Sequence, residues 1–444
     1  MNNVQNILIA ATLAEQFAKE NNLASYFRGK QKLFIPRIAH PEGGEIYIGD
    51  KSYEALTPLI KLAYQQDNNL KRVTFNEVRH LALGLFGDFL FGRIQGLETD
   101  EKFLKKLNER IMETLKSFQV VVPCNIGYPT DKEHEINFGS AKLINVMKLE
   151  RLLNSEWKHL DDQVIEKYWI ETENHYRKFF WFLVIDTPPV SSLEIARKIA
   201  KTTAYHAINL LHLFLPQIYS NKWEVGFHLN PTPQAYSIFS ESRKLNYYIE
   251  QSFTGGNAGI DPSFWDDVQN GEMREYIEIQ SICIDSFLNL RKPPPAVSRL
   301  LDATYWIGDA IRETSAPTRI IKYVMGLERL VFFKKERSCK KKIFANRITL
   351  LLIQIGFISR AEAGQMHLAC KDLYRIRSEI SHGASSPFEE TLNLSINKVH
   401  DIARFSVMSY MRLVKDLTEE NNTDTLLKNW FKRFVPELNF DDGD

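Results

Sequence analysis

The sequence predicts an α+β protein, in which a mixed α/β N-terminal region is followed by an all-α helical bundle. Two observations support this prediction. Over the first two thirds of the chain, short β-rich runs alternate with segments of helical periodicity. After Pro293-Pro294-Pro295 the periodicity is helical only, and three consecutive prolines cannot continue a helix. The prolines therefore mark the predicted boundary between the two parts.

This boundary gives a domain plan for the 444 residues. We predict an α+β region over 1–292, the proline boundary at 293–295, a helical domain over 296–420 and a C-terminal extension over 421–444. The first region is expected to divide again, into 1–117 and 118–292. A chain of this length is long enough for two or three domains with their own cores.

The N-terminal elements follow from periodicity and turn residues. Helical spacing of apolar residues predicts helices at 1–28, 51–66, 74–93 and 99–117, with extended pieces at 33–36 and 45–48. Runs of β-branched and aromatic residues predict strands at 118–122, 135–138, 179–185, 222–229, 235–240 and 245–249. A serine at 191 or 192 is expected to cap a helix that runs to about Leu215, and 254–262 is expected to be a loop.

Downstream of the prolines we expect four or five helices joined by short connections. The predicted helices are 296–313, 316–333, 340–355, 359–382 and 388–417. Pro317 fits the first turn of the second helix, where its missing N–H costs nothing. Residues 439–444 are predicted to form a frayed acidic tail.

Composition restricts the possible functions. The net charge is +1, so any attraction to nucleic acid must come from a local patch rather than from the whole chain. Four scattered cysteines lack the C-x-x-C spacing of zinc sites and redox pairs, which indicates a reducing compartment and no metal site. No run reaches the roughly 20 apolar residues of a membrane span. We predict a cytoplasmic protein with no membrane contact.

The helix predicted over 359–382 carries the most specific chemistry of the chain. Ser359 and Glu362 fit a capping box at its start, and Gly383 fits the left-handed residue that ends a helix. The predicted buried stripe is Met366, Leu373, Ile376 and Ile380. His382 then lies in the last turn, where unpaired carbonyls favour a positive charge.

An arginine and a histidine near this helix end are sufficient for RNA cleavage without a metal. An imidazole can move the proton of a 2′-hydroxyl, and a guanidinium can stabilise the charged phosphate. Arg377 precedes His382 by five residues, about 140° around a helix. Arg375 lies closer to the direction of His382 but two turns away. Spacing alone is more typical of a capped helix end with solvated charges than of a catalytic site.

The segment Asp372-Leu373-Tyr374-Arg375-Ile376-Arg377-Ser378-Glu379-Ile380-Ser381-His382-Gly383 resembles the signature of HEPN domains, an Arg followed after four to six residues by a His. Two upstream segments, 303–310 and the helix with Leu327-Glu328-Arg329-Leu330, resemble the branch called ApeA-like HEPN. The resemblance covers about residues 296–417. It implies a HEPN-like helical bundle for the C-terminal domain.

The resemblance also implies a function. HEPN proteins of this kind are commonly metal-independent endoribonucleases of prokaryotic toxin–antitoxin and anti-phage systems, and they usually act as dimers. It implies that His382 is the catalytic histidine and Arg377 the motif arginine, while Arg375 also satisfies the looser spacing. The supporting residues it implies are Glu328, Arg375, Ser378 and Glu379. The implied partners are RNA, a second copy of the chain, and an antitoxin or phage trigger protein, with no metal and no cofactor.

A basic run between two predicted helices is the second candidate site. Its six cations are Lys334, Lys335, Arg337, Lys340, Lys341 and Lys342. Such a run can bind RNA phosphates, although solvated loops between helices are often equally charged.

Two rival functions stay open from the sequence. The first is a catalytically inactive HEPN-fold binding or scaffold protein, and the second is a plain helical interaction protein. The N-terminal region carries no catalytic motif, and its pattern over 121–139 is similar to the front part of some ApeA-like proteins, which implies a sensory or regulatory role.

Overall fold

The computed structural model divides the chain into two compact units, which are described separately. Unit 1 comprises 1–118 and 187–199, and unit 2 comprises 119–186 and 200–444. The structure describes residues 37–39, 45–47, 50–66, 69–126, 132–149, 151, 180–215, 224–225, 234–239, 245–250, 263–289, 293–333, 336, 339–384, 386, 391–415 and 423–435. The predictions for 1–28, 33–36, 254–262 and 439–444 lie outside these residues.

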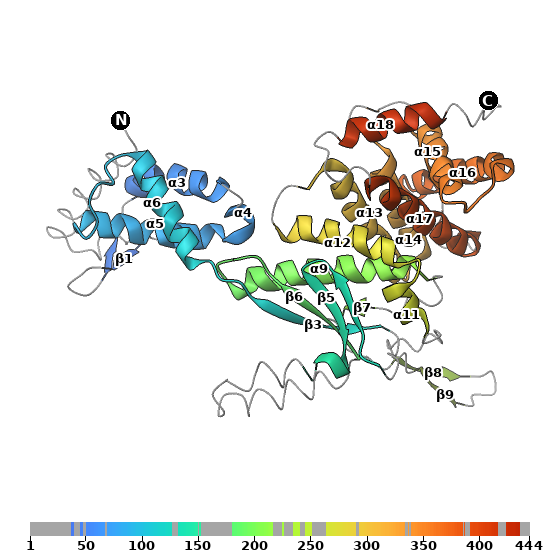
Figure 1. Cartoon of the computed structure of the whole chain (residues 1–444), viewed down its shortest axis with the longest axis horizontal. Coiled ribbons are helices and arrows are strands. Elements are labelled where there is room, and N and C mark those ends of the chain that lie inside the picture. The colour runs from blue at the N-terminus through green and yellow to red at the C-terminus, as the bar shows by residue number, and fades with distance from the viewer. Residues whose placement is uncertain are drawn as a thin grey trace. The chain divides into compact units, whose positions relative to one another are not determined.

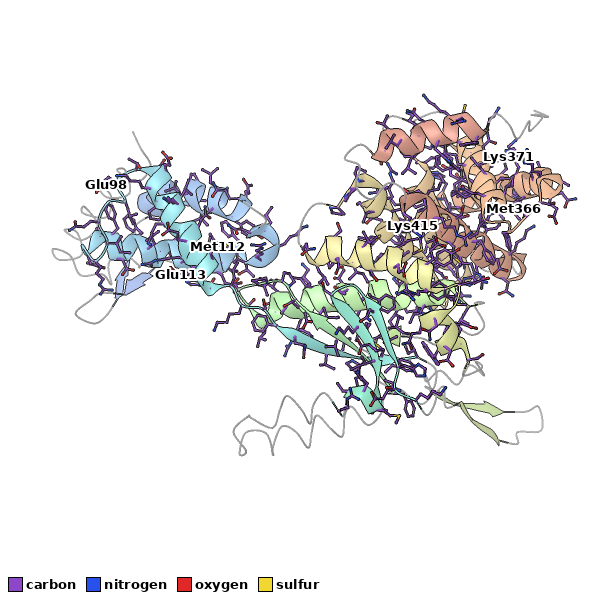
Figure 2. All side chains as sticks on the ribbon, viewed as in Figure 1. Glu98, Met112, Glu113, Met366, Lys371 and Lys415 are labelled. Carbon is purple, nitrogen blue, oxygen red and sulfur yellow. The ribbon has the colours of Figure 1, made fainter. Side chains whose placement is uncertain are left out.

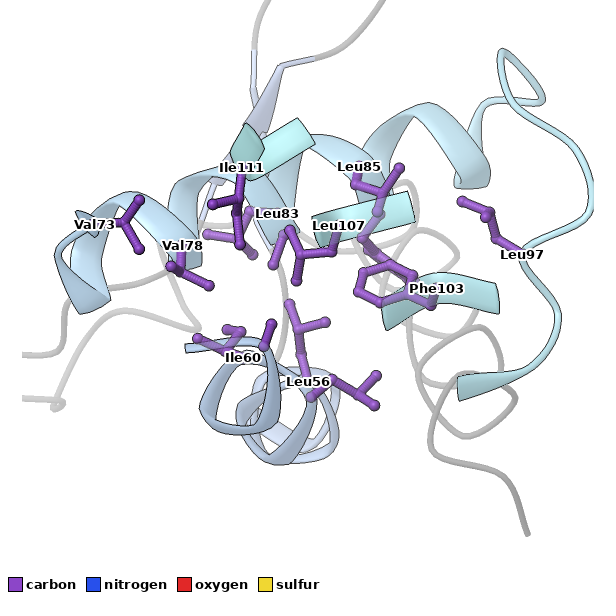
Figure 3. Close-up of a cluster of buried hydrophobic side chains, with 14 residues drawn as sticks. Leu56, Ile60, Val73, Val78, Leu83, Leu85, Leu97, Phe103, Leu107 and Ile111 are labelled. Carbon is purple, nitrogen blue, oxygen red and sulfur yellow. The ribbon is translucent and has the colours of Figure 1, made fainter. Parts of the chain in front are cut away.

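Unit 1 is a small helical assembly with its own core. Its elements are β1 (Arg37–Ala39), β2 (Glu45–Tyr47), α3 (Asp50–Gln65), α4 (Asn69–Arg72), α5 (Phe75–Leu90) and α6 (Asp100–Thr114). Thr74 and Glu77 form a capping box at the start of α5, and Thr99 caps α6. Buried leucines, isoleucines and phenylalanines of α3, α5 and α6 fill the centre (Figure 3). The three helices predicted between residues 51 and 117 are confirmed.

Unit 2 contains an antiparallel sheet with the strand order β4-β5-β6-β3-β7. Its strands are β3 (Gln119–Asn125), β4 (Glu135–Phe138), β5 (Ala141–Asn145), β6 (Trp181–Asp186) and β7 (Glu224–Val225). The first five residues of β6 are buried, as expected for the apolar run that lies between two neighbours. A separate hairpin joins β8 (Gln234–Phe239) to β9 (Leu245–Glu250). Strand β5 was not predicted.

Eight helices among the described residues complete unit 2, with α9 (Leu193–Leu213) entering it at residue 200 (Figure 1). They are α11 (Ser263–Asn270), α12 (Arg274–Leu288), α13 (Pro295–Arg312), α14 (Ala316–Val331), α15 (Lys340–Gln354), α16 (Ala363–Ser381), α17 (Thr391–Lys415) and α18 (Thr423–Phe434). Helix α17 packs against α12, α13, α14 and α15 and is therefore the central helix of the bundle. The α+β class and the five predicted C-terminal helices are confirmed.

The proline run lies inside unit 2. Pro293 to Pro295 coincide with the start of α13, whereas the two compact units divide near residue 118, close to the predicted internal division at 117. Helices α11 and α12 precede the prolines and were not predicted.

Asp285 of α12 accepts hydrogen bonds from the backbone N–H and hydroxyl of Ser140 in the β4–β5 turn, at 2.7 and 2.8 Å. This contact joins the sheet to the bundle.

Helices α9 and α13 approach each other closely at Gly308. A Cβ atom at this position would clash with the side chain of Asn209, which is fully buried and accepts a hydrogen bond from Arg312. We expect Gly308→Ala to lower the free energy of unfolding by about 1–3 kcal/mol, because the packed helices must separate. Urea denaturation measures this change.

Gly364 provides the matched control for that variant. It lies in α16 with no atom within 4 Å of the position of an added Cβ. Gly364→Ala should therefore raise the free energy of unfolding by about 0.4–1 kcal/mol through reduced chain entropy. Equal effects of the two substitutions would contradict the close approach of α9 and α13.

Within the described part of the chain, no helix combines the length and the apolar content that crossing a bilayer requires.

Candidate active site

The helix that carries the Arg–His segment is defined by its two ends. Ser359 and Glu362 form the predicted capping box around a short 3₁₀ turn, and α16 follows from Ala363. At the other end, Gly383 has φ +72° and donates to the carbonyl of Ile380, while the N–H of Ala384 donates to the carbonyl of Glu379. This is a Schellman motif, so the predicted left-handed glycine is confirmed.

The buried stripe of α16 differs from the predicted one. The buried side chains are Ala363, His367, Cys370 and Leu373. Of the predicted stripe, only Leu373 is buried, and Met366, Ile376 and Ile380 are half-buried. Figure 2 labels Met366 on this helix. The observed stripe continues by four residues to Arg377, which is why this charged side chain faces the bundle.

Arg377 lies against α14, where it meets a carboxylate. Its Nη2 atom donates to Oε2 of Glu328 at 3.2 Å, and the two side chains are 26% and 18% exposed. The Nε atom of Arg377 is buried without a hydrogen-bond partner among the described residues. Glu328 therefore fixes the guanidinium while satisfying only part of its donors.

Tyr374 completes this cluster and was not selected from the sequence. Its phenol lies close enough to Glu328 to act on the pKa of that carboxyl, and its ring lies 5.3 Å from that of Phe344 and 6.3 Å from that of Phe332. Tyr374 precedes Arg377 by three residues and so shares its helix face. Burial and the nearby Glu328 carboxylate raise the pKa of the Tyr374 phenol.

Burial is the largest influence on Glu328 and raises the pKa of its carboxyl group. Arg377, Lys340 and Tyr374 act in the opposite direction without cancelling it. Lys340 lies at the start of α15 and belongs to the basic run. Its charge lowers the pKa of Glu328, so part of the basic run acts electrostatically on this carboxyl.

His382 is exposed at the end of α16, as its predicted role requires. Its backbone N–H donates to the carbonyl of Ser378 at 3.0 Å, which leaves the imidazole unused by the cap. Within the described residues, no hydrogen bond or ion pair joins His382 to Arg377. The structure thus places the arginine on the inward face of α16 and the histidine at its exposed end.

Unlike Arg377, Arg375 contacts carboxylates of its own helix. Its Nη1 atom donates to both carboxylate oxygens of Glu379, at 2.7 and 2.9 Å, and its Nε atom lies 3.5 Å from Asp372. These are exposed pairs on the surface of a single helix, whose energies are small. Arg375 and Glu379 therefore form a surface pair, and the cluster with Glu328 contains Arg377 instead.

The basic run is described only in part. Lys340, Lys341 and Lys342 are exposed in the first turn of α15, and Lys334, Lys335 and Arg337 lie outside the described residues. The acid within the run, Glu336, accepts from Arg347 at 2.7 and 2.8 Å and lies 3.7 Å from Lys428. Glu336 therefore anchors this connection to α15 and α18.

No group of three or more His, Cys, Asp or Glu side chains that could hold a metal ion occurs among the described residues.

The raised pKa of Glu328 leads to a prediction about stability and pH. A carboxyl whose pKa is higher in the folded state stabilises the fold fully below its unfolded pKa, and this contribution is lost as the pH rises through the folded value. Glutamine does not ionise, so Glu328→Gln does not lose this stabilisation as the pH rises. We expect the variant to gain stability relative to the parent as the pH rises above the ordinary value of 4.5.

Urea denaturation of both proteins between about pH 4 and pH 7 measures this difference. Glutamine keeps an oxygen that can accept from Arg377, so it changes the charge with little change in shape. A variant that loses stability relative to the parent as the pH rises would show that attraction to Arg377 outweighs the burial of Glu328.

Comparison of the chain with protein-family models finds no match. Comparisons with curated proteins and with solved structures likewise find no match.

Proposed function

We propose that this protein is an endoribonuclease that cleaves RNA with Arg377 and His382, as its resemblance to ApeA-like HEPN domains implies. The observation that carries the proposal is an exposed imidazole at the end of a capped helix, five residues from a guanidinium that a carboxylate holds in place. Imidazole and guanidinium are the two groups that RNA transesterification needs.

The proposed reaction is an internal transesterification. The imidazole of His382 removes the proton of a 2′-hydroxyl, and the 2′-oxygen attacks the adjacent phosphorus. The bond from phosphorus to the 5′-oxygen breaks, and an imidazolium returns a proton to that oxygen. Arg377 stabilises the extra negative charge on the phosphorane. The products are a 2′,3′-cyclic phosphate and a 5′-hydroxyl.

The surrounding residues have supporting roles in this proposal. Glu328 orients Arg377, and the exposed lysines of the first turn of α15 hold RNA phosphates. A second copy of the chain, bound through the helical domain, supplies a second Arg–His pair. The protein acts in the cytoplasm as a toxin or anti-phage effector, and residues 1–292 respond to an antitoxin or a phage trigger.

A scaffold without nuclease activity is the second candidate, and one observation favours it. Both arginines of the segment are paired with carboxylates, Arg377 with Glu328 and Arg375 with Glu379. In a HEPN-fold binding protein these pairs would hold helices together and would not need to open for a phosphate.

Expression in bacteria distinguishes the two candidates. Induction of the intact chain should arrest growth, and His382→Ala should relieve the arrest at the same protein level. A scaffold predicts no arrest, or an arrest that His382→Ala does not change. Arg377→Ala tests the choice of arginine against Arg375→Ala, because only the former is expected to relieve the arrest.

A further inference from the structure

Helix α18 presents two faces of different character, and its inner face fixes it to the bundle. Asp424 accepts from Nε and Nη2 of Arg299 at 2.7 and 2.9 Å, and Arg299 is only 4% exposed. Phe431 is buried, with its ring 6.2 Å from that of Phe333 and 5.3 Å from the guanidinium of Arg347. These contacts hold α18 against α13 and α15.

The outer face of α18 combines aromatic rings with cations. Trp430 and Phe434 are half-buried, with ring centroids 5.3 Å apart. Lys432 and Arg433 are exposed, and the Arg433 guanidinium lies over the Phe434 ring at 5.2 Å. Aromatic rings beside cations are the chemistry that binds single-stranded nucleic acid without sequence preference, through base stacking and phosphate contacts.

Helix α18 is connected to the candidate active site through described residues of the segment between α14 and α15. Lys428 of α18 lies 3.7 Å from Glu336 in that segment. At its near end, Phe332 contacts Tyr374 of the Glu328 cluster, and the next residue, Phe333, contacts Phe431. At its far end begins α15, whose Lys340 acts on Glu328. The described residues of this segment, Phe332, Phe333 and Glu336, thus link the site to α18.

We propose that the outer face of α18 is a second RNA contact, in which a base of single-stranded RNA stacks on Trp430 and phosphates bind Lys432 and Arg433. This inference rests on the proposed function and extends it by a substrate-binding surface. It makes single-stranded RNA, rather than a duplex, the preferred substrate, because an unpaired base must be free to stack.

An anionic membrane is a poorer fit for the same helix. A helix that lies in a membrane surface needs a broad apolar face. The apolar residues Leu427 and Phe431 are already buried in the bundle, and Leu426, at 39% exposure, is the one apolar side chain of α18 among the large exposed ones. The remaining outer surface is small and interrupted by charge.

RNA binding is measured with the full-length chain carrying His382→Ala, so that the probe is not cut. The probe is a fluorescein-labelled, unstructured RNA of about 12 nucleotides, within the range that one binding groove covers. In this background, Trp430→Ala should weaken Kd about 5- to 10-fold through loss of one stacked base. Lys432→Ala with Arg433→Ala should reduce the slope of log K against log salt by about 1.4.

The double variant Lys142→Ala with Arg274→Ala is the matched control. It also removes two exposed cations from unit 2, but from β5 and α12, and should leave both Kd and salt slope unchanged. Because Lys432 and Arg433 are exposed, their variant tests the proposal even if Trp430→Ala proves unstable.

The outcomes separate this inference from the proposed function. If the wild-type chain cleaves RNA and both α18 variants bind the probe as tightly as their parent, α18 does not bind RNA, but the proposed nuclease activity is supported. If the α18 variants lose binding but the wild-type chain never cleaves RNA, α18 binds RNA and the proposed nuclease activity is wrong. Sedimentation with phosphatidylglycerol vesicles that depends on Trp430, with no RNA binding, would overturn the inference in favour of a membrane.

Discussion

Replacing His382 with alanine should lower the rate of RNA cleavage by at least about 100-fold, because a positioned acid–base group commonly contributes a factor of 10²–10⁴. The fold should be unaffected. The imidazole is exposed, and the helix end is held by backbone hydrogen bonds of residues 382–384, which alanine can also make. Single-turnover cleavage of a labelled RNA and the unfolding midpoint in urea measure the two effects separately.

His80 offers a matched control on another helix. It is an exposed histidine of α5, and His80→Ala removes an imidazole without touching the Arg–His segment. Cleavage by His80→Ala should equal that of the parent protein. An unchanged rate for His382→Ala would remove His382 from the reaction, and an equal loss in both variants would indicate a general effect of losing a histidine.

The largest effect on stability is expected at Arg299. Besides its two hydrogen bonds to Asp424, its Nη1 atom donates to the carbonyls of Arg329 and Phe332. Arg299→Ala removes a buried guanidinium from both carbonyls and from Asp424, whose side chain is 31% exposed, so the free energy of unfolding should fall by about 3–5 kcal/mol. Urea denaturation followed by circular dichroism measures the loss.

Arg329→Ala is the control for that substitution. Arg329 pairs with Asp302 at 2.6 Å, but the two side chains are 42% and 46% exposed, and exposed pairs contribute at most about 1 kcal/mol. A loss at Arg299 no larger than the loss at Arg329 would show that α18 is not fixed to the bundle by the ion pair between Asp424 and the buried Arg299.

Local signals made the ends of α16 predictable. Ser359, Glu362 and Gly383 act on backbone groups within a few residues of themselves, so their roles can be inferred from spacing alone. The direction of Arg377 could not be inferred in this way. Its partner Glu328 lies 49 residues earlier, and the apolar pattern of α16 assigned the buried face to other residues.

The missed elements have a similar explanation. In α12, the alternation Ile277-Glu278-Ile279 is compatible with a strand as well as with a helix. The segment is helical in the structure, where it packs against β4 and α17. Strand β5 is only five residues long and is recognisable mainly as the partner of β4 across Gly139 and Ser140. Helix α18 depends on Arg299, which lies 125 residues before Asp424.

The RNA ends that the purified wild-type chain produces in the presence of EDTA reveal whether it cleaves by transesterification. We expect cleavage that EDTA does not inhibit, with a 2′,3′-cyclic phosphate on one product and a 5′-hydroxyl on the other. Products with a 3′-hydroxyl, or no cleavage of any RNA by the protein at stoichiometric concentration, would contradict the proposed reaction.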